Sequence, residues 1–194
     1  EIGIFSMEKR GLISVKNPSE LFLDQKTLDN PGSVVSAILE GNRIFLVEVQ
    51  ALVVNSGYGM AKRTFLGVDT HRANLLIAAM EKILGLPLGS HDIILNIVGG
   101  LSVKETALDL AIVCAIISSL KEIALPPKSV VVGEVGLTGE IRSISMMNKR
   151  LSEISKLGFK QCIFPKTKIY EPVDILKCKE YEHIKDVMAN LYPK

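Results

Sequence analysis

The alternation of apolar and polar residues along this 194-residue chain predicts several strands. Residues 33–39 and 43–54 are rich in apolar and β-branched side chains, and in the second segment Leu46, Glu48 and Gln50 alternate with Val47, Val49 and Ala51, which is the period of a strand. The turn residues Glu40-Gly41-Asn42 separate them, so the two segments predict a hairpin. Residues 92–98 are mostly apolar and rich in β-branched side chains, and Gly99-Gly100 follows them, which predicts a further strand ending in a glycine turn.

Residues 70–84 show the other period, in which apolar side chains recur every three or four positions, and they predict an amphipathic helix. Asp69 or Thr70 suits the amino-terminal cap, and Gly85 and Pro87 suit the end. The side expected to be buried carries Leu75, Leu76, Ala79, Met80 and Ile83.

Residues 107–117 form the most apolar segment, and they predict a helix buried between layers at the centre of the domain. Ser102 and Glu105 have the spacing of a capping box, so we expect the helix to begin there. Asp109 is the only charged residue in this segment. A buried carboxylate needs a hydrogen-bond or cationic partner, or stays protonated, and we favour a structural tether to a backbone amide or an arginine over catalysis.

The next part of the chain predicts strand, hairpin and helix in turn. Residues 129–132 predict a strand, and residues 133–142 contain three glycines spaced for a hairpin. Residues 147–154 predict an amphipathic helix that ends near Gly158. This order of elements indicates an α/β unit.

Both ends of the chain are more polar than its centre. Residues 2–7 and 11–15 predict two short strands, followed by a helical turn at 17–20 and a polar linker at 24–32. We therefore expect residues 1–32 to be a connector and residues 33–194 to be the main domain. Residues 166–181 predict irregular structure, and residues 182–191 a short terminal helix.

Composition narrows the class of protein. Hydrophobic residues make up 47% of the chain, enough for one large core, and no apolar run approaches the roughly 18 residues of a membrane span. No signal peptide is visible. Cys114, Cys162 and Cys178 are scattered, which favours buried thiols in a reducing compartment. With the histidines also isolated, we expect a cytoplasmic protein without a metal site.

Four motifs carry a resemblance to a known family. Residues 104–111, 132–142, 148–151 and 162–165 resemble the proteolytic domain of Lon proteases, and together with residues 15–23, 31–35, 46–53 and 63–69 they are similar to the Lon-like C-terminal domain of the RadA (Sms) family of bacterial DNA repair proteins. The likeness covers about residues 1–165. It implies an α+β fold of the ribosomal protein S5 domain 2-like type, with mixed sheets and packed helices.

The residues that would carry peptidase chemistry are missing. Lon proteases use a serine nucleophile and a lysine base, and the matching positions hold Leu108 and Asn148. Thr106 and Lys149 are rotated away from these positions around their helices, and Ser102 suits the helix cap. We therefore expect no catalytic residue. The chain also lacks a phosphate-binding Gly-x-x-x-x-Gly-Lys-Ser/Thr loop, so it should not hydrolyse ATP alone.

The resemblance implies a longer parent protein that has a zinc finger and a RecA-like ATPase, uses ATP, magnesium and zinc, and assembles as a homo-hexameric ring. It implies branch migration of recombination intermediates, with single-stranded or branched DNA and a RecA-type recombinase as partners. Lys62, Arg63 and Arg72 are candidate DNA-binding residues around a loop that contains Tyr58. The net charge of only +2 argues against strong DNA binding by this domain alone, and an ordinary solvated surface is the alternative for these three.

Two other functions remain open. One is an active Lon-like serine peptidase whose dyad is displaced to neighbouring residues. The other is a protein-interaction module without DNA contact.

Overall fold

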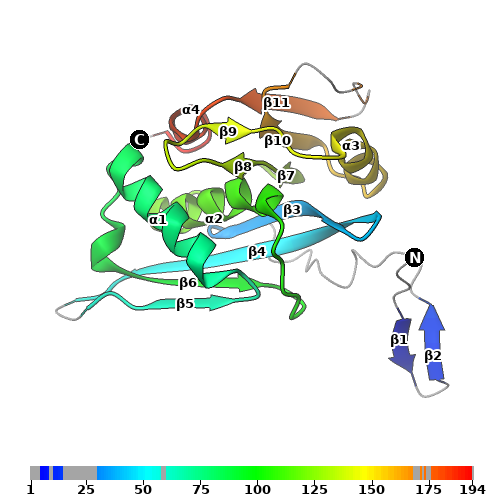
Figure 1. The fold of residues 1–194 in the computed structure, drawn as a ribbon, viewed down its shortest axis with the longest axis horizontal. Coiled ribbons are helices and arrows are strands. Elements are labelled where there is room, and N and C mark those ends of the chain that lie inside the picture. The colour runs from blue at the N-terminus through cyan, green and yellow to red at the C-terminus, as the bar shows by residue number, and fades with distance from the viewer. Residues whose placement is uncertain are drawn as a thin grey trace.

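A seven-stranded mixed sheet is the framework of the domain (Figure 1). The computed structural model describes residues 5–8, 11–14, 30–57, 60–167, 171, 173 and 176–193. Within them the strand order is β11-β10-β7-β3-β4-β6-β5. The strands are β3 (Ser33–Glu40), β4 (Arg43–Asn55), β5 (Arg63–Leu66), β6 (His91–Ile97), β7 (Ser129–Val131), β10 (Gln161–Pro165) and β11 (Lys177–Tyr181).

The sheet has a parallel half and a largely antiparallel half. Strands β11, β10, β7 and β3 run parallel to one another. Strand β4 is antiparallel to both β3 and β6, and the edge strand β5 is parallel to β6. A separate short hairpin is formed by β8 (Glu134–Val135) and β9 (Ile141–Arg142). The fold is therefore α+β with a mixed sheet, as expected.

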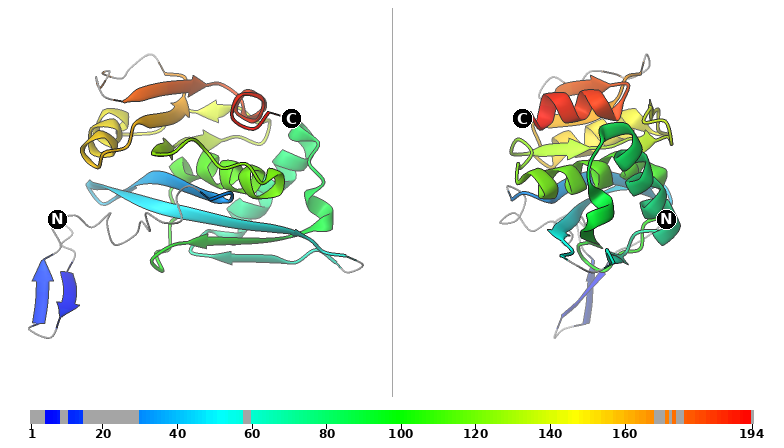
Figure 2. Two further views of the ribbon diagram at one scale, coloured as in Figure 1. Left: turned by 180° about the vertical axis from the view of Figure 1, so that it is seen from behind. Right: turned by 90° about the vertical axis from the view of Figure 1, so that its left-hand side faces the viewer.

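In the part of the chain that the structure describes, four helices and two short 3-10 turns pack on this framework. The helices are α1 (Thr70–Leu84), α2 (Asp109–Lys121), α3 (Met147–Lys156) and α4 (Ile184–Leu191), and the turns are η2 (Leu88–Ser90) and η3 (Thr106–Leu108). Helices α1 and α4 lie at one end of the domain and α3 lies at the other (Figures 1 and 2). Helix α2 is buried over almost its whole length, as its apolar sequence predicts.

The apolar residues form two clusters that share the central strands. The larger cluster joins β4 to α1, α2 and α4, and the smaller one joins β3, β7 and β10 to α3. Val47 of β4 belongs to the first cluster and Leu46 to the second, because successive side chains of a strand point to opposite faces. The middle of β4 is thus buried on both faces. It includes the carboxylate of Glu48, which accepts hydrogen bonds from Ser33 and Gln50 at 2.8 Å each.

The outer half of the sheet leaves apolar side chains open to solvent. Leu52 of β4 lies directly opposite Ile94 of β6, and they are 54% and 37% exposed. Leu66 on the edge strand β5 is 55% exposed. Adjacent exposed apolar side chains of this kind are common at contact surfaces between proteins.

Local sequence signals located most elements. Helix α1 has the predicted bounds; the carboxylate of Asp69 accepts the Arg72 amide, and Gly85 ends the helix with a φ of 65°. The prediction of irregular structure for residues 166–181 was wrong at its end, since β11 pairs in register with β10. Strand β11 lies at the edge of the sheet and has few apolar residues, so its sequence does not resemble a buried strand.

The amino-terminal segment is described only in part. Strands β1 (Phe5–Glu8) and β2 (Gly11–Ser14) form an antiparallel hairpin close to the predicted strands. The predicted helical turn at 17–20, and most of the linker predicted at 24–32, lie outside the described residues. No helix in the described part of the chain has the length and apolar character needed to cross a bilayer.

Candidate functional site

The segment that leads into α2 does not form the predicted capping box. Ser102 is exposed, and no side chain caps η3, which begins after Glu105. The carboxylate of Glu105 instead accepts the amide of Leu39 at 2.6 Å and forms an ion pair with Arg150 of α3. The prediction from Ser102 and Glu105 was therefore wrong. Leaving the fully buried guanidinium without a carboxylate would cost more free energy than leaving a solvent-accessible backbone amide without a cap, so Glu105 pairs with Arg150.

Arg150 connects three parts of the fold from the centre of the smaller cluster. Its side chain is completely buried on α3. Besides Glu105, its guanidinium donates to the carbonyl oxygens of Ala37 on β3 and of Ser145, the latter at 3.0 Å. Sequence reasoning missed this residue. The available signal was its spacing, because position 150 falls on the helix face of Met147, Leu151 and Ile154, and all four are buried.

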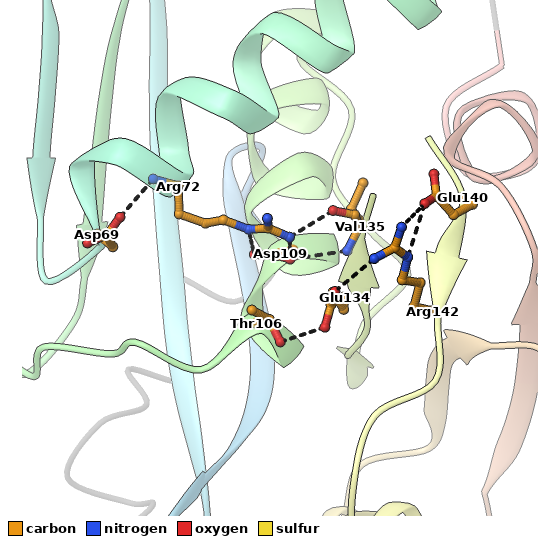
Figure 3. Close-up of polar contacts among 8 residues, drawn as sticks. All are labelled: Asp69, Arg72, Thr106, Asp109, Glu134, Val135, Glu140 and Arg142. Atoms are coloured by element: carbon orange, nitrogen blue, oxygen red, sulfur yellow. Dashed lines mark hydrogen bonds and ion pairs between the residues drawn. The ribbon is translucent and has the colours of Figure 1, made fainter. Parts of the chain in front are cut away.

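Asp109 lies at the start of α2 and is tied to two other segments (Figure 3). Both of its carboxylate oxygens accept from the guanidinium of Arg72 on α1, and Oδ2 also accepts the amide of Val135 at 3.1 Å. Arg72 donates in addition to the carbonyl of Val135 at 2.8 Å. The structure thus supplies both kinds of partner expected for this carboxylate, an amide and an arginine.

Burial has the largest effect on the ionisation of Asp109, whose side chain is only 2% exposed. Desolvation raises the pKa of this carboxyl, although the hydrogen bonds from Arg72 and Val135 act in the opposite direction. The same contact raises the pKa of the Arg72 guanidinium, chiefly through its hydrogen bond to Asp109. Through these contacts Arg72 and Asp109 hold α1, α2 and β8 together.

A second row of polar contacts lies nearer the surface. The hydroxyl of Thr106 donates to Glu134 at 2.9 Å, and Arg142 lies between the carboxylates of Glu134, at 3.6 Å, and Glu140 (Figure 3). Hydrogen bonds from Thr138, its own backbone and Arg142 lower the pKa of the Glu140 carboxyl to about 2. The network joins the β8–β9 hairpin to the beginning of α2.

In Lon proteases two positions carry the catalytic serine and lysine. In this chain those positions hold no catalytic side chain, and their surroundings differ. Leu108 is 2% exposed and borders a hollow of about 170 Å³ that is also lined by Arg72 and Asp109. Asn148 is exposed and borders a separate hollow of about 560 Å³. The Asn148 side-chain oxygen accepts the amide of Glu171 at 2.9 Å. A leucine and an asparagine at these places provide neither a nucleophile nor a base.

The neighbouring hydroxyl and amine groups have other contacts. Thr106 donates to Glu134, and the ammonium of Lys149 donates to the backbone and side-chain oxygens of Asn42, the latter at 2.9 Å. A serine or threonine nucleophile requires a base within about 3 Å. The geometry brings neither Thr106 nor Lys149 into such a pair.

The three predicted DNA-binding residues differ in their contacts. Lys62 is exposed, and its amide donates to Asp92 at 2.7 Å. The guanidinium of Arg63 donates to the carbonyls of His91 and Leu88. The guanidinium of Arg72 pairs with Asp109 and donates to the carbonyl of Val135. Tyr58 lies outside the described residues.

Among the described residues, no group of three or more His, Cys, Asp and Glu is arranged to hold a metal ion. His91 and His183 instead contact backbone carbonyls, those of Pro87 at 2.7 Å and Thr138 at 2.9 Å.

The sequence of this chain is similar to those of bacterial DNA repair proteins. Residues 68–168, about half of the chain, match the family model described as subunit ChlI of Mg-chelatase. The chain is 44% identical over 165 residues to the DNA repair protein RadA of Bacillus subtilis (strain 168), and 45% identical over 176 residues to that of Streptococcus pneumoniae. These alignments cover 85% and 91% of this chain but only 36% and 40% of the relatives.

Proposed function

Because this chain belongs to the ChlI family and is a RadA-type Lon-like domain, we propose that it is a proteolytically inactive scaffold and DNA-interaction domain of a DNA repair protein. The observation that carries the proposal is the state of the two dyad positions. Leu108 is buried in apolar surroundings, and Asn148 is hydrogen-bonded to the amide of Glu171. The fold of a peptidase domain is kept here without the groups that cleave peptides.

The interactions around these positions support a scaffold. Glu105 and Asp109, on either side of Leu108, each form an ion pair with an arginine from another helix, Arg150 and Arg72 respectively. Both carboxylates therefore contribute to helix packing.

The relatives suggest the wider setting. This chain spans 35–40% of the RadA proteins that it matches, so most of each relative lies outside the aligned segment. In the proposal the parent is a DNA-dependent ATPase that uses ATP, magnesium and zinc. It works in the cytoplasm as a ring-shaped hexamer with a RecA-type recombinase and promotes branch migration. Residues 1–32 are the connector to that ATPase.

A cleavage assay and a binding assay test the proposal together. The purified chain is incubated with unfolded casein, and separately with fluorescently labelled single-stranded and branched DNA at low salt. We expect no casein fragments, measurable DNA binding, and weaker binding for Lys62→Gln than for the control Lys82→Gln, an exposed lysine on α1. Casein cleavage that Ser102→Ala or Lys149→Gln abolishes would establish a displaced dyad instead.

A protein-interaction role without DNA contact is the second candidate, and one observation favours it. Leu52, Leu66 and Ile94 form an exposed apolar area on the outer half of the sheet. If the chain binds neither DNA substrate at low salt, while Leu52→Ser disrupts association with a partner protein, this candidate replaces the first.

A further inference from the structure

Two of the three cysteines lie side by side on neighbouring strands. Cys162 of β10 and Cys178 of β11 are register partners, and the two strands run parallel. Partners in a parallel ladder carry their side chains on the same face of the sheet. Cys162 is completely buried in the smaller apolar cluster, and Cys178 is partly buried and packs against that cluster. In the sequence the two residues are far apart, and strand pairing brings them together.

The spacing of the two residues suits a covalent bond. Neighbouring strands are about 4.8 Å apart, so the two Cα atoms lie within the range of about 4.4–6.8 Å that disulfides span. The Cβ atoms of a disulfide are about 3.5–4.5 Å apart, slightly closer than the strand spacing, so one strand has to move a little. Strand β11 has the freedom to do so, because it lies at the end of the described strand order and is paired with β10 on one side.

Simple packing is the structural alternative, since a buried cysteine behaves as a small apolar residue. That explanation fits Cys162, and it fits Cys114 of α2, which is fully buried in the larger cluster. It fits Cys178 less well. Every other residue of β11 is charged or aromatic, as expected for a partly solvated edge strand. Core packing therefore does not account for a small thiol at position 178.

The ionisation of the thiols decides the order in which they react. Burial raises the pKa of the Cys162 thiol, and the neighbouring Cys178 raises it further. Burial, and then the charge of Glu180, also raise the pKa of the Cys178 thiol. The thiolate is the form that attacks an oxidant, so both groups react slowly at neutral pH. Cys178 reacts first because it is the more accessible of the two.

We propose that Cys162 and Cys178 form a reversible disulfide when the protein meets hydrogen peroxide. The thiolate of Cys178 attacks one oxygen of the peroxide, the O–O bond breaks, hydroxide leaves, and Cys178 becomes a sulfenic acid. The sulfur of Cys162 then attacks the sulfenic sulfur, forms the S–S bond and displaces the hydroxyl group as water. The hydroxide takes up the proton that Cys178 released. The two thiols are thus oxidised to one disulfide, and the peroxide is reduced to two molecules of water.

The bond acts on the carboxyl-terminal part of the domain. An edge strand is hydrogen-bonded on one side, so it opens more easily than an interior strand, and a covalent link between β11 and β10 opposes that opening. Helix α4 begins shortly after β11, so the link also secures the connection between α4 and the sheet. This modification is independent of the DNA interaction proposed above.

Thiol counting tests the pair. The 194-residue chain is exposed to hydrogen peroxide at about pH 8, where more of each thiol is ionised, and is then unfolded and titrated with a chromogenic thiol reagent. We expect the free thiols to fall from three to one, and dithiothreitol to restore all three. Trypsin digestion without a reductant should yield residues 161–166 joined to residues 178–179, since a lysine precedes and ends each segment.

Two single variants separate the pair from chance oxidation. Cys114→Ala removes the cysteine of the larger cluster, and both of its remaining thiols should be lost to peroxide and regained with dithiothreitol. Cys178→Ser changes a partly exposed position, so its melting temperature should stay close to that of the unaltered chain, yet it should form no intramolecular disulfide. Peroxide should slow amide hydrogen exchange in β11 of the unaltered chain and leave it unchanged in Cys178→Ser.

The outcomes are distinct. If three thiols remain after peroxide treatment, or if dithiothreitol does not restore the lost thiols, the pair forms no disulfide and the proposal is overturned. A bond that joins two chains, or one that includes Cys114, overturns it as well. A reversible loss of two thiols that Cys114→Ala retains and Cys178→Ser abolishes supports it. Each of these results leaves the proposed DNA interaction untouched.

Discussion

Arg150 of α3 and Glu105, which immediately precedes η3, form an ion pair whose guanidinium is completely buried. The pair joins the two segments in which Lon proteases hold their serine and lysine, because Glu105 lies shortly before Leu108 and Arg150 shortly after Asn148. The frame of the site is thus retained by electrostatic contacts. Leu108 and Asn148, which lie close to this ion pair in the sequence, provide neither the nucleophile nor the base of a Lon protease.

Substituting Glu105 should lower the free energy of unfolding more than substituting Arg150. Glu105→Ala leaves the buried charge of Arg150 without its carboxylate, and we expect a loss of about 3–5 kcal/mol in the free energy of unfolding by urea. Arg150→Met places an apolar chain in the same space, and the freed Glu105 is partly hydrated, so the loss should be smaller. The reverse order would contradict this account.

The exposed ion pair of Lys156 and Glu153 is the control for that experiment. Its atoms are 3.5 Å apart, and both side chains are open to solvent. Lys156→Gln should therefore change the free energy of unfolding by less than about 0.5 kcal/mol.

Asp109→Asn tests the tether between α1, α2 and β8. The amide cannot accept from both Arg72 and Val135 with two charged oxygens, so we expect a loss of about 1–3 kcal/mol in stability, measured by thermal melting. Asp69→Asn makes the same chemical change at the cap of α1, where asparagine serves as well as aspartate, and should be nearly neutral. Equal melting temperatures for the two variants would rule the tether out.

Gly67 holds the segment before η3 against β6. Its carbonyl accepts the amide of Val103 at 2.8 Å, and an added Cβ would lie 2.2 Å from the carbonyl oxygen of Leu101. Gly67→Ala should reduce stability in urea by about 1–3 kcal/mol more than Gly85→Ala. Gly85 is the fair comparison, since its φ is also positive and a Cβ there meets nothing within 4 Å. Similar losses for both would show that the close approach is unimportant.

The Glu140 carboxyl should titrate near pH 2 in the folded chain, well below its ordinary value of 4.5, when followed by NMR. Since its pKa is lowered on folding, its contribution to stability is present above pH 4.5 and is lost as the pH falls toward 2. Thr138→Val should raise this pKa more than Arg142→Gln, because the Thr138 hydrogen bond is the largest cause of the shift. An unchanged titration in Thr138→Val would contradict that cause.

Local patterns predicted most of the fold because they depend on neighbouring residues. The period of residues 70–84 and the cap at Asp69 located α1, and the turn at residues 40–42 located the hairpin of β3 and β4. The capping box at Ser102 and Glu105 failed for a different reason. Spacing cannot reveal that a distant arginine competes for the glutamate.

The amino-acid order alone was sufficient to recognise a Lon-like domain and to show that its dyad positions hold Leu108 and Asn148, because a missing nucleophile is a property of the side chain itself. Tertiary packing decided which charged side chains form ion pairs. Arg72 looks like a surface cation in the sequence and is paired with Asp109, while Arg150 is completely buried and is paired with Glu105 from a distant segment. Pairing between segments far apart in the chain sets these distances, and no local pattern records them.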